Sequence, residues 1–144
     1  MDKEKYKLAF MDMALRFALT SEANRLQVGC LIVKDGQIIS QGVNGTPVGW
    51  NTNCCEGEDG LTYWFVKHAE VQALNKLRNS TFTAKGSVMY VSHSPCKNCA
   101  LEIIDAGISK VYYHVAYRDE TGIALLSSYG IEVEQLGGGS KIGL

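Results

Sequence analysis

The chain has 144 residues, of which 46% are hydrophobic and 20% are charged, as is typical of a globular protein. Fourteen Lys and Arg against fifteen Asp and Glu give a formal net charge of -1, which argues against a broad basic surface for a nucleic-acid backbone. Intrinsic disorder and collagen-like order are excluded, and we predict one domain over residues 1–144 with a flexible tail from about residue 137.

The cysteines and the N-terminal residues indicate where in the cell the protein is found. The five cysteines are an odd number, and Lys7, Asp12 and Arg16 interrupt the apolar residues that a signal peptide or membrane span would need. We therefore expect free or metal-bound thiols, a cytoplasmic protein and no membrane partner.

The first half of the chain predicts a helix, a hairpin and a long loop. From Tyr6 to Leu19 apolar residues recur every three or four positions, which indicates an amphipathic helix. Residues 28–33 and a run that begins at Ile38 flank Asp35-Gly36, a dipeptide typical of tight hairpins. Residues 44–60 are rich in Gly and Asn without periodicity, and loops of this length are usually functional.

The second half alternates helices with strands. We expect helices over residues 68–77, 96–106 and 121–129, and strands over residues 87–92, 111–115 and 131–136. Gly107 and Gly130 are placed to end two of the helices. This order predicts an α/β fold of three α/β/α layers around a five-stranded mixed sheet.

His68, Cys96 and Cys99 are the strongest candidate site. Cys96 and Cys99 lie one helical turn apart, so both thiols can face one cation while an imidazole from another helix adds a third ligand. This donor set suits Zn²⁺. The alternatives are a redox pair, two half-buried thiols, or a closed structural site completed by Cys54, Cys55, His93 or His114.

Glu70 adds a catalytic element to this site. The chain reads His68-Ala69-Glu70 and later Pro95-Cys96-Lys97-Asn98-Cys99, which is the zinc-deaminase signature, with the Glu as proton shuttle and not as ligand. Three protein ligands leave a position for water, whose pKa zinc lowers so that hydroxide can attack the ring carbon that carries the amino group of a nucleobase. The alternative for Glu70 is an ordinary carboxylate favoured at a helix N-terminus.

The sequence resembles the deoxycytidylate (dCMP) deaminases, of the short phage-encoded kind, within the zinc-dependent cytidine deaminase superfamily. Besides the two zinc motifs, the match includes residues 27–30, the Asn-Gly-x-Pro-x-Gly loop at 44–49, Asn-Cys-Cys-Glu at 53–56 and residues 106–108. The resemblance implies a cytidine-deaminase-like fold and a hydrolase that converts dCMP to dUMP and ammonia for thymidylate synthesis. Only eleven residues, Gly57–Lys67, separate Glu56 from His68, so we expect one catalytic zinc per chain and no second metal.

The resemblance also implies contacts to the base and sugar. Asn44 is expected to hydrogen-bond the sugar or base, the N–H of Ala69 to meet the ring carbonyl, and the carbonyl near Ser94 to receive the amino group. Asn44-Gly45 is equally typical of a simple turn.

Two arginines and a tyrosine are candidates for the rest of the nucleotide. Arg25 has the planar fork that suits phosphate. Tyr117 and Arg118 follow a strand whose carboxyl end faces the crevice where α/β domains bind ligands, so Tyr117 is expected to stack on the base and Arg118 to reach phosphate. Solvated arginines and a core tyrosine are the alternatives.

The resemblance further implies regulation, with activation by Mg²⁺-dCTP and inhibition by dTTP in a homo-oligomer, a hexamer being favoured. The expected effector-binding residues are Gly45, Gly49, Asn53 and Glu56. Trp50 is expected to cover the site and Trp64 to pack beneath it. Competing functions are a deaminase of free cytidine or deoxycytidine, guanine or tRNA adenosine, and a noncatalytic zinc- or nucleotide-binding module.

Overall fold

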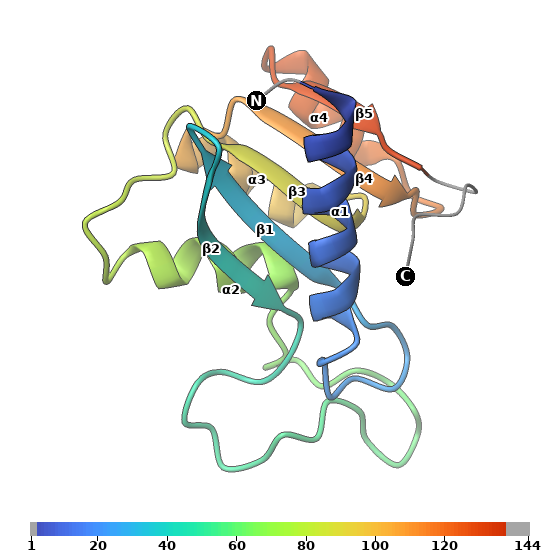
Figure 1. The fold of residues 1–144 in the computed structure, drawn as a ribbon. Helices are drawn as coiled ribbons and strands as arrows, with labels where there is room; N and C mark the ends of the chain where they lie inside the picture. The colour runs from blue at the N-terminus through green and yellow to red at the C-terminus, as the bar shows by residue number, and fades with distance from the viewer. Residues whose placement is uncertain (1–2, 138–144) are drawn as a thin grey trace.

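The computed structural model describes residues 3–137, which form four helices and one five-stranded sheet (Figure 1). The helices are α1 (Glu4–Ala18), α2 (Ala69–Leu77), α3 (Lys97–Ala106) and α4 (Thr121–Ser128). The strands are β1 (Gly29–Lys34), β2 (Gln37–Val43), β3 (Val88–His93), β4 (Lys110–Val115) and β5 (Glu132–Gln135). None of the helices in residues 3–137 is long and apolar enough to cross a membrane.

The sheet is mixed, as predicted, with strand order β2-β1-β3-β4-β5. β1 runs antiparallel to both β2 and β3, whereas β3, β4 and β5 are parallel to one another. The β1–β2 hairpin turns at Asp35 and Gly36, whose φ angles of 51° and 77° are those that a tight two-residue hairpin turn needs.

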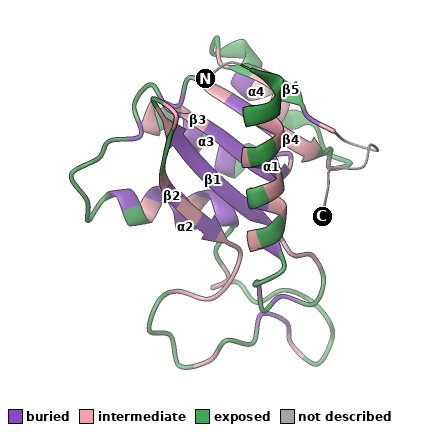
Figure 2. Ribbon diagram, in the orientation of Figure 1, coloured by how far each residue is buried: buried purple, intermediate pink, exposed green. Residues whose placement is uncertain are grey.

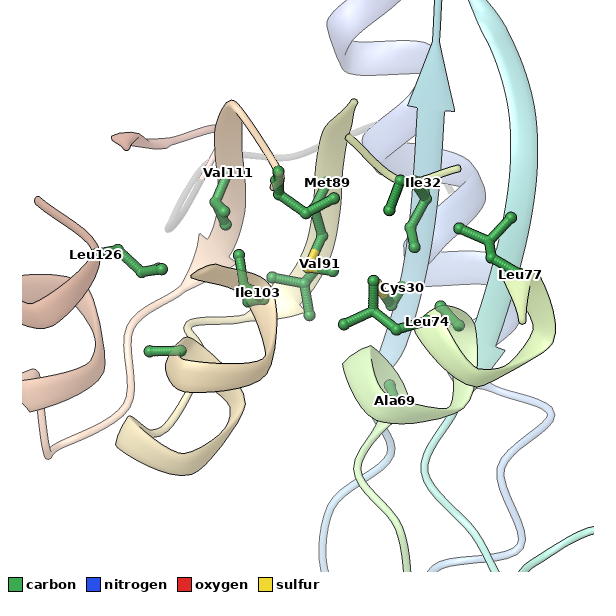
Figure 3. Close-up of a cluster of buried hydrophobic side chains, with 14 of the residues drawn as sticks. Cys30, Ile32, Ala69, Leu74, Leu77, Met89, Val91, Ile103, Val111 and Leu126 are labelled. Atoms are coloured by element: carbon green, nitrogen blue, oxygen red, sulfur yellow. The ribbon is translucent and has the colours of Figure 1, made fainter. Parts of the chain in front are cut away.

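Helices cover both faces of the sheet, which confirms the three predicted layers. Of the described helices, α1 covers one face (Figure 1). Its Met11 and Ala14 pack against Leu31, Tyr90 and Tyr112 of the sheet. On the other face α2, α3 and α4 enclose a larger core, in which the strand side chains meet those of the helices (Figure 3). The central strands are therefore buried on both sides, while the loop between β2 and α2 is largely exposed (Figure 2).

The predicted elements agree with the structure to within two residues at each end, but the long loop was predicted too short. It runs from residue 44 to residue 68, and two isolated bridges, Gly45 with Lys67 and Glu56 with Thr62, fold it back on itself. The Gly45–Lys67 bridge joins the two ends of the loop, far apart in sequence, and no local pattern marks it. The predicted tail beyond Gly137 lies outside the described residues.

The strand directions gather several loops at one edge of the sheet. Because β1 is antiparallel to β2 and β3, its first residues lie beside the last residues of both neighbours. The parallel strand β4 ends at the same edge. Val28, Asn44, Ser94 and Tyr117, which come directly before or after these strands, therefore lie near one another, and α2 and α3 begin at this edge.

The close packing of β2 against α2 gives a test of the fold. A methyl group on Gly42 would lie 2.5 Å from the carbonyl oxygen of Ala69 and 2.6 Å from the nitrogen of Ala73. We expect Gly42→Ala to lower the free energy of unfolding by about 1–3 kcal/mol, because the helix backbone must shift away. The matched control is Gly45→Ala, since no heavy atom lies within 4 Å of its added methyl group. Equal thermal midpoints for the two variants would contradict the packing described.

Candidate active site

A cavity of about 540 Å³ opens at this edge of the sheet, a size typical of small-molecule sites. Its walls come from three parts of the chain that are far apart in sequence: the segment before β1, the loop after β2 with the start of α2, and the loop after β4. The polar side chains that line it are those of Arg25, Asn44, Glu56, Thr62, His68, Glu70, Tyr117 and Arg118.

His68, Cys96 and Cys99 come together where α2 and α3 begin. His68 is the N-cap of α2 and its side chain makes no capping hydrogen bond, so the imidazole is free to face α3. Cys96 is the N-cap of α3, and Cys99 lies in the first turn of that helix. Nδ1 of His68 is 3.2 Å from Sγ of Cys99 and 3.6 Å from Sγ of Cys96.

These three side chains fit a tetrahedral zinc ion. Nitrogen and sulfur ligands at normal zinc bond lengths lie roughly 3.5 Å apart in a tetrahedron, close to the separations observed. The three ligand atoms lie within 4.8 Å of one another, and within residues 3–137 no other His, Cys, Asp or Glu joins them. Cys54, Cys55, His93 and His114 therefore do not complete a closed site in the described part of the chain.

The surroundings of the cysteines favour thiolates. Hydrogen bonds from Cys99 and His68 lower the pKa of Cys96 to about 3, and the same contact with Cys96, together with burial, raises the pKa of Cys99. Two helix N-termini face the sulfurs, and their partial positive charge also favours the ionised form. One thiolate thus forms readily, and a divalent cation would favour the second.

Glu70 lies in the first turn of α2 and lines the same cavity. Its side chain is only 3% exposed. Burial raises the pKa of Glu70 to about 7, although the nearby His68 opposes this shift. A carboxyl group with this pKa exchanges a proton easily near neutral pH, which is the property that a general acid and base needs.

The structure brings five of the six predicted substrate residues to the cavity, whereas Ser94 is not among the residues that line it. Arg25, Ala69, Tyr117 and Arg118 line it, and burial raises the pKa of Tyr117 to about 12. Asn44 also lines it, but its side-chain amide accepts from the N–H of Val28 and donates to the carbonyl of Leu26. The amide thereby fixes the loop to the start of β1.

Ser94 has a clear structural contact. Its hydroxyl is fully buried and accepts a hydrogen bond of 2.8 Å from the N–H of Tyr117. This bond ties the loop after β3, which leads into Cys96, to the loop after β4.

The loop residues predicted to bind effectors do not lie together around one site. Glu56 is buried and lines the cavity, whereas Gly49 and Asn53 are exposed. Gly45 bridges to Lys67 at the base of the loop. The prediction that Trp64 packs beneath the site is wrong, because its side chain is 87% exposed and touches the edge of Phe65.

Comparison with known proteins agrees with this geometry. A family profile described as the cytidine and deoxycytidylate deaminase zinc-binding region matches residues 4–115, which include all three candidate ligands and Glu70. The chain belongs to this deaminase family. Zn²⁺ is accordingly its metal, and the donor set of His68, Cys96 and Cys99 fits that ion.

Individual deaminases are similar over most of the chain. The deoxycytidylate deaminase of Schizosaccharomyces pombe is 32% identical over 88% of this chain, and that of Homo sapiens is 36% identical over 72% of it. The chain spans only 42% and 61% of the lengths of these two relatives. The dCMP deaminase of the cyanophage S-TIM5, solved in complex with dCMP and dUMP, has 45% identity and a TM-score of 0.92, covering 94% of this chain and 100% of its own.

The ligand set predicts how metal content will respond to mutation. We expect about one zinc per chain in protein purified without added metal, and loss of that zinc in Cys99→Ala, because two remaining ligands hold the ion poorly. Cys54→Ser is the matched control, since Cys54 is exposed and outside the ligand group. Metal analysis by mass spectrometry measures both, and zinc retained by Cys99→Ala would contradict the assignment.

Proposed function

We propose that this chain is a dCMP deaminase, which hydrolyses dCMP to dUMP and ammonia. The observation that carries the proposal is the buried carboxyl of Glu70 in one cavity with His68, whose imidazole gathers with the thiols of Cys96 and Cys99. A structural metal site has no use for a proton-exchanging group in the adjacent cavity. The family match and the similarity to named dCMP deaminases support the choice of reaction and substrate.

His68, Cys96 and Cys99 would hold the zinc, and Glu70 would move the protons. When bound, Zn²⁺ supplies a hydroxide nucleophile at neutral pH, because it lowers the pKa of water. Glu70 accepts one proton from the water that attacks C4 and delivers it to N3 of the cytosine ring. It then accepts the second proton from that oxygen, now bonded to C4, and donates it to the amino group, so that the C4–N bond breaks and ammonia leaves. One carboxyl therefore serves first as base and then as acid, and its pKa of about 7 suits both roles.

The remaining cavity residues suit a nucleotide better than a nucleoside or a tRNA. Arg25 and Arg118 both line the cavity and provide two positive charges for a 5′-phosphate dianion. A free nucleoside has no group that would use them. A tRNA would favour an extended basic surface, which the net charge of -1 does not supply.

Regulation and assembly are part of the same proposal. We propose that Mg²⁺-dCTP activates and dTTP inhibits the enzyme at the loop of residues 44–68, in a homo-oligomer for which a hexamer is favoured. Exposed apolar side chains on that loop, those of Val48, Trp50, Leu61 and Trp64, support a contact with another subunit.

Domain organisation and location complete the proposal. We propose that residues 1–144 form a single deaminase domain, because both hydrophobic clusters in the described residues pack against one sheet. A cytoplasmic location is supported by the five cysteines, none of which is paired in a disulfide.

Glu70→Ala tests the proton-transfer role. We expect zinc content and the circular dichroism spectrum to stay as in the wild type, while kcat falls by a factor on the order of 10²–10⁴, because the shuttle moves protons and does not bind the metal. Turnover near the wild-type level would overturn the mechanism.

Ammonia release measured side by side from dCMP, CMP, deoxycytidine and dCTP identifies the substrate.

The arginines predict a preference for the phosphorylated substrate. A charge-assisted contact to phosphate contributes about 1.5–3 kcal/mol, so kcat/KM for dCMP should exceed that for deoxycytidine roughly ten- to a hundredfold. Arg25→Ala or Arg118→Ala should remove most of this preference by slowing dCMP alone. Equal kcat/KM for the two substrates in the wild type would indicate a nucleoside deaminase. Activity only on a tRNA anticodon stem-loop would indicate a deaminase of tRNA adenosine.

A further inference from the structure

Glu56 carries a buried carboxylate on the wall of the active-site cavity. Its side chain is 8% exposed and lines the same cavity as His68 and Glu70. Oε2 accepts hydrogen bonds from the backbone N–H groups of Asn24 at 2.9 Å and Arg25 at 3.1 Å. Oε1 is buried and accepts no hydrogen bond from any group in residues 3–137.

A buried oxygen such as Oε1 of Glu56 needs a hydrogen-bond donor. Buried carboxylate oxygens are almost always hydrogen-bonded, and leaving one unpaired is costly. Within residues 3–137 the only ion pair joins Lys110 and Glu132, so no lysine, arginine or histidine there pairs with Glu56. Because the Glu56 side chain lines the cavity, a molecule bound there is the candidate to supply the missing donor.

We propose that Oε1 of Glu56 accepts a hydrogen bond from the 3′-hydroxyl of the deoxyribose of dCMP. This inference rests on the proposed function and deepens it. At neutral pH dCMP offers two kinds of donor, the amino group on C4 and the 3′-hydroxyl. The amino group must lie at the Glu70 end of the cavity, where it leaves, so the hydroxyl remains for Glu56.

The place of Glu56 in the wall agrees with a sugar contact. Its Oε2 holds the backbone of Arg25, whose side chain lines the cavity and is proposed to bind the 5′-phosphate. The deoxyribose joins that phosphate to the base, so it lies between the arginine and the zinc ligands. A carboxylate there attracts a hydroxyl and repels a second phosphate, which selects nucleotides with a free 3′-hydroxyl.

The contact assigns Glu56 to the substrate and not to an effector. The carboxylate also links two segments 31 and 32 residues apart in sequence, because it bonds the backbone before β1 from the loop after β2. A test must therefore separate recognition of the hydroxyl from this structural link.

The experiment compares dCMP with 2′,3′-dideoxycytidine 5′-monophosphate, which differs from dCMP only in lacking the 3′-hydroxyl. In the wild type we expect kcat/KM for dCMP to be roughly ten- to a hundredfold higher. In Glu56→Gln this ratio should fall severalfold, since a neutral hydrogen bond is about half as strong as a charge-assisted one. In Glu56→Ala it should approach one.

A substitution that only loosens the loop lowers kcat/KM for both substrates by the same factor. The ratio of the two kcat/KM values is therefore unchanged by such an effect. Glu58→Gln is the matched control, because Glu58 is an exposed carboxylate two residues away and should leave the ratio unchanged. Where Glu56→Ala is too slow to assay, calorimetric affinities for dUMP and its 3′-deoxy analogue give the same comparison without turnover.

Three outcomes would overturn the proposal in distinguishable ways. A wild type that deaminates dCMP and the dideoxy nucleotide equally well removes the role of Glu56 and leaves the proposed function intact. A constant ratio across the Glu56 variants, with both rates lowered, means that Glu56 only ties the two segments together. A wild type without activity on dCMP overturns the proposed function and this inference together.

Discussion

The approach of His68 to Cys96 and Cys99 is the contact on which the rest of the site depends. It requires the first turns of α2 and α3 to face each other across the edge of the sheet, with separations of 3.2 and 3.6 Å between the imidazole and the two sulfurs. Two helix N-termini, one imidazole and two thiols at this distance form a strongly polarised cluster, which a divalent cation stabilises. Glu70 lies in the first turn of α2, so the position of its carboxyl group follows from the position of His68.

Small residues allow the helices to come this close. Gly42 lets α2 lie directly on β2, and a side chain at Gly122 would meet the carbonyl of Pro95 and the backbone of Cys96. The start of α4 therefore packs against the loop that carries a zinc ligand. Ser94 ties the same loop to the backbone of Tyr117, so the zinc ligand, Tyr117 and the start of α4 are connected to one another.

The sequence was most informative where a local pattern decides the structure. Periodicity located all four helices and five strands of the described chain, and Asp35-Gly36 marked the hairpin, because turn and helix preferences act over a few residues. The spacing of Cys96 and Cys99 likewise placed both thiols at one helix start. No local pattern, however, pairs Gly45 with Lys67 or leaves Trp64 exposed, since those outcomes depend on contacts between distant segments.

Glu56 shows why the substrate side of the cavity was harder to predict than the metal side. The zinc ligands lie at the starts of α2 and α3, where helix geometry fixes their direction. Glu56 instead lies in a loop, where its carboxylate accepts hydrogen bonds from the backbone of Asn24 and Arg25. The metal end of the cavity is thus built at the starts of two helices, and the end that we propose to bind sugar and phosphate is built on loops. Because loops accept substitution with little effect on the helices, the substrate can change among deaminases of this fold while the zinc chemistry stays the same.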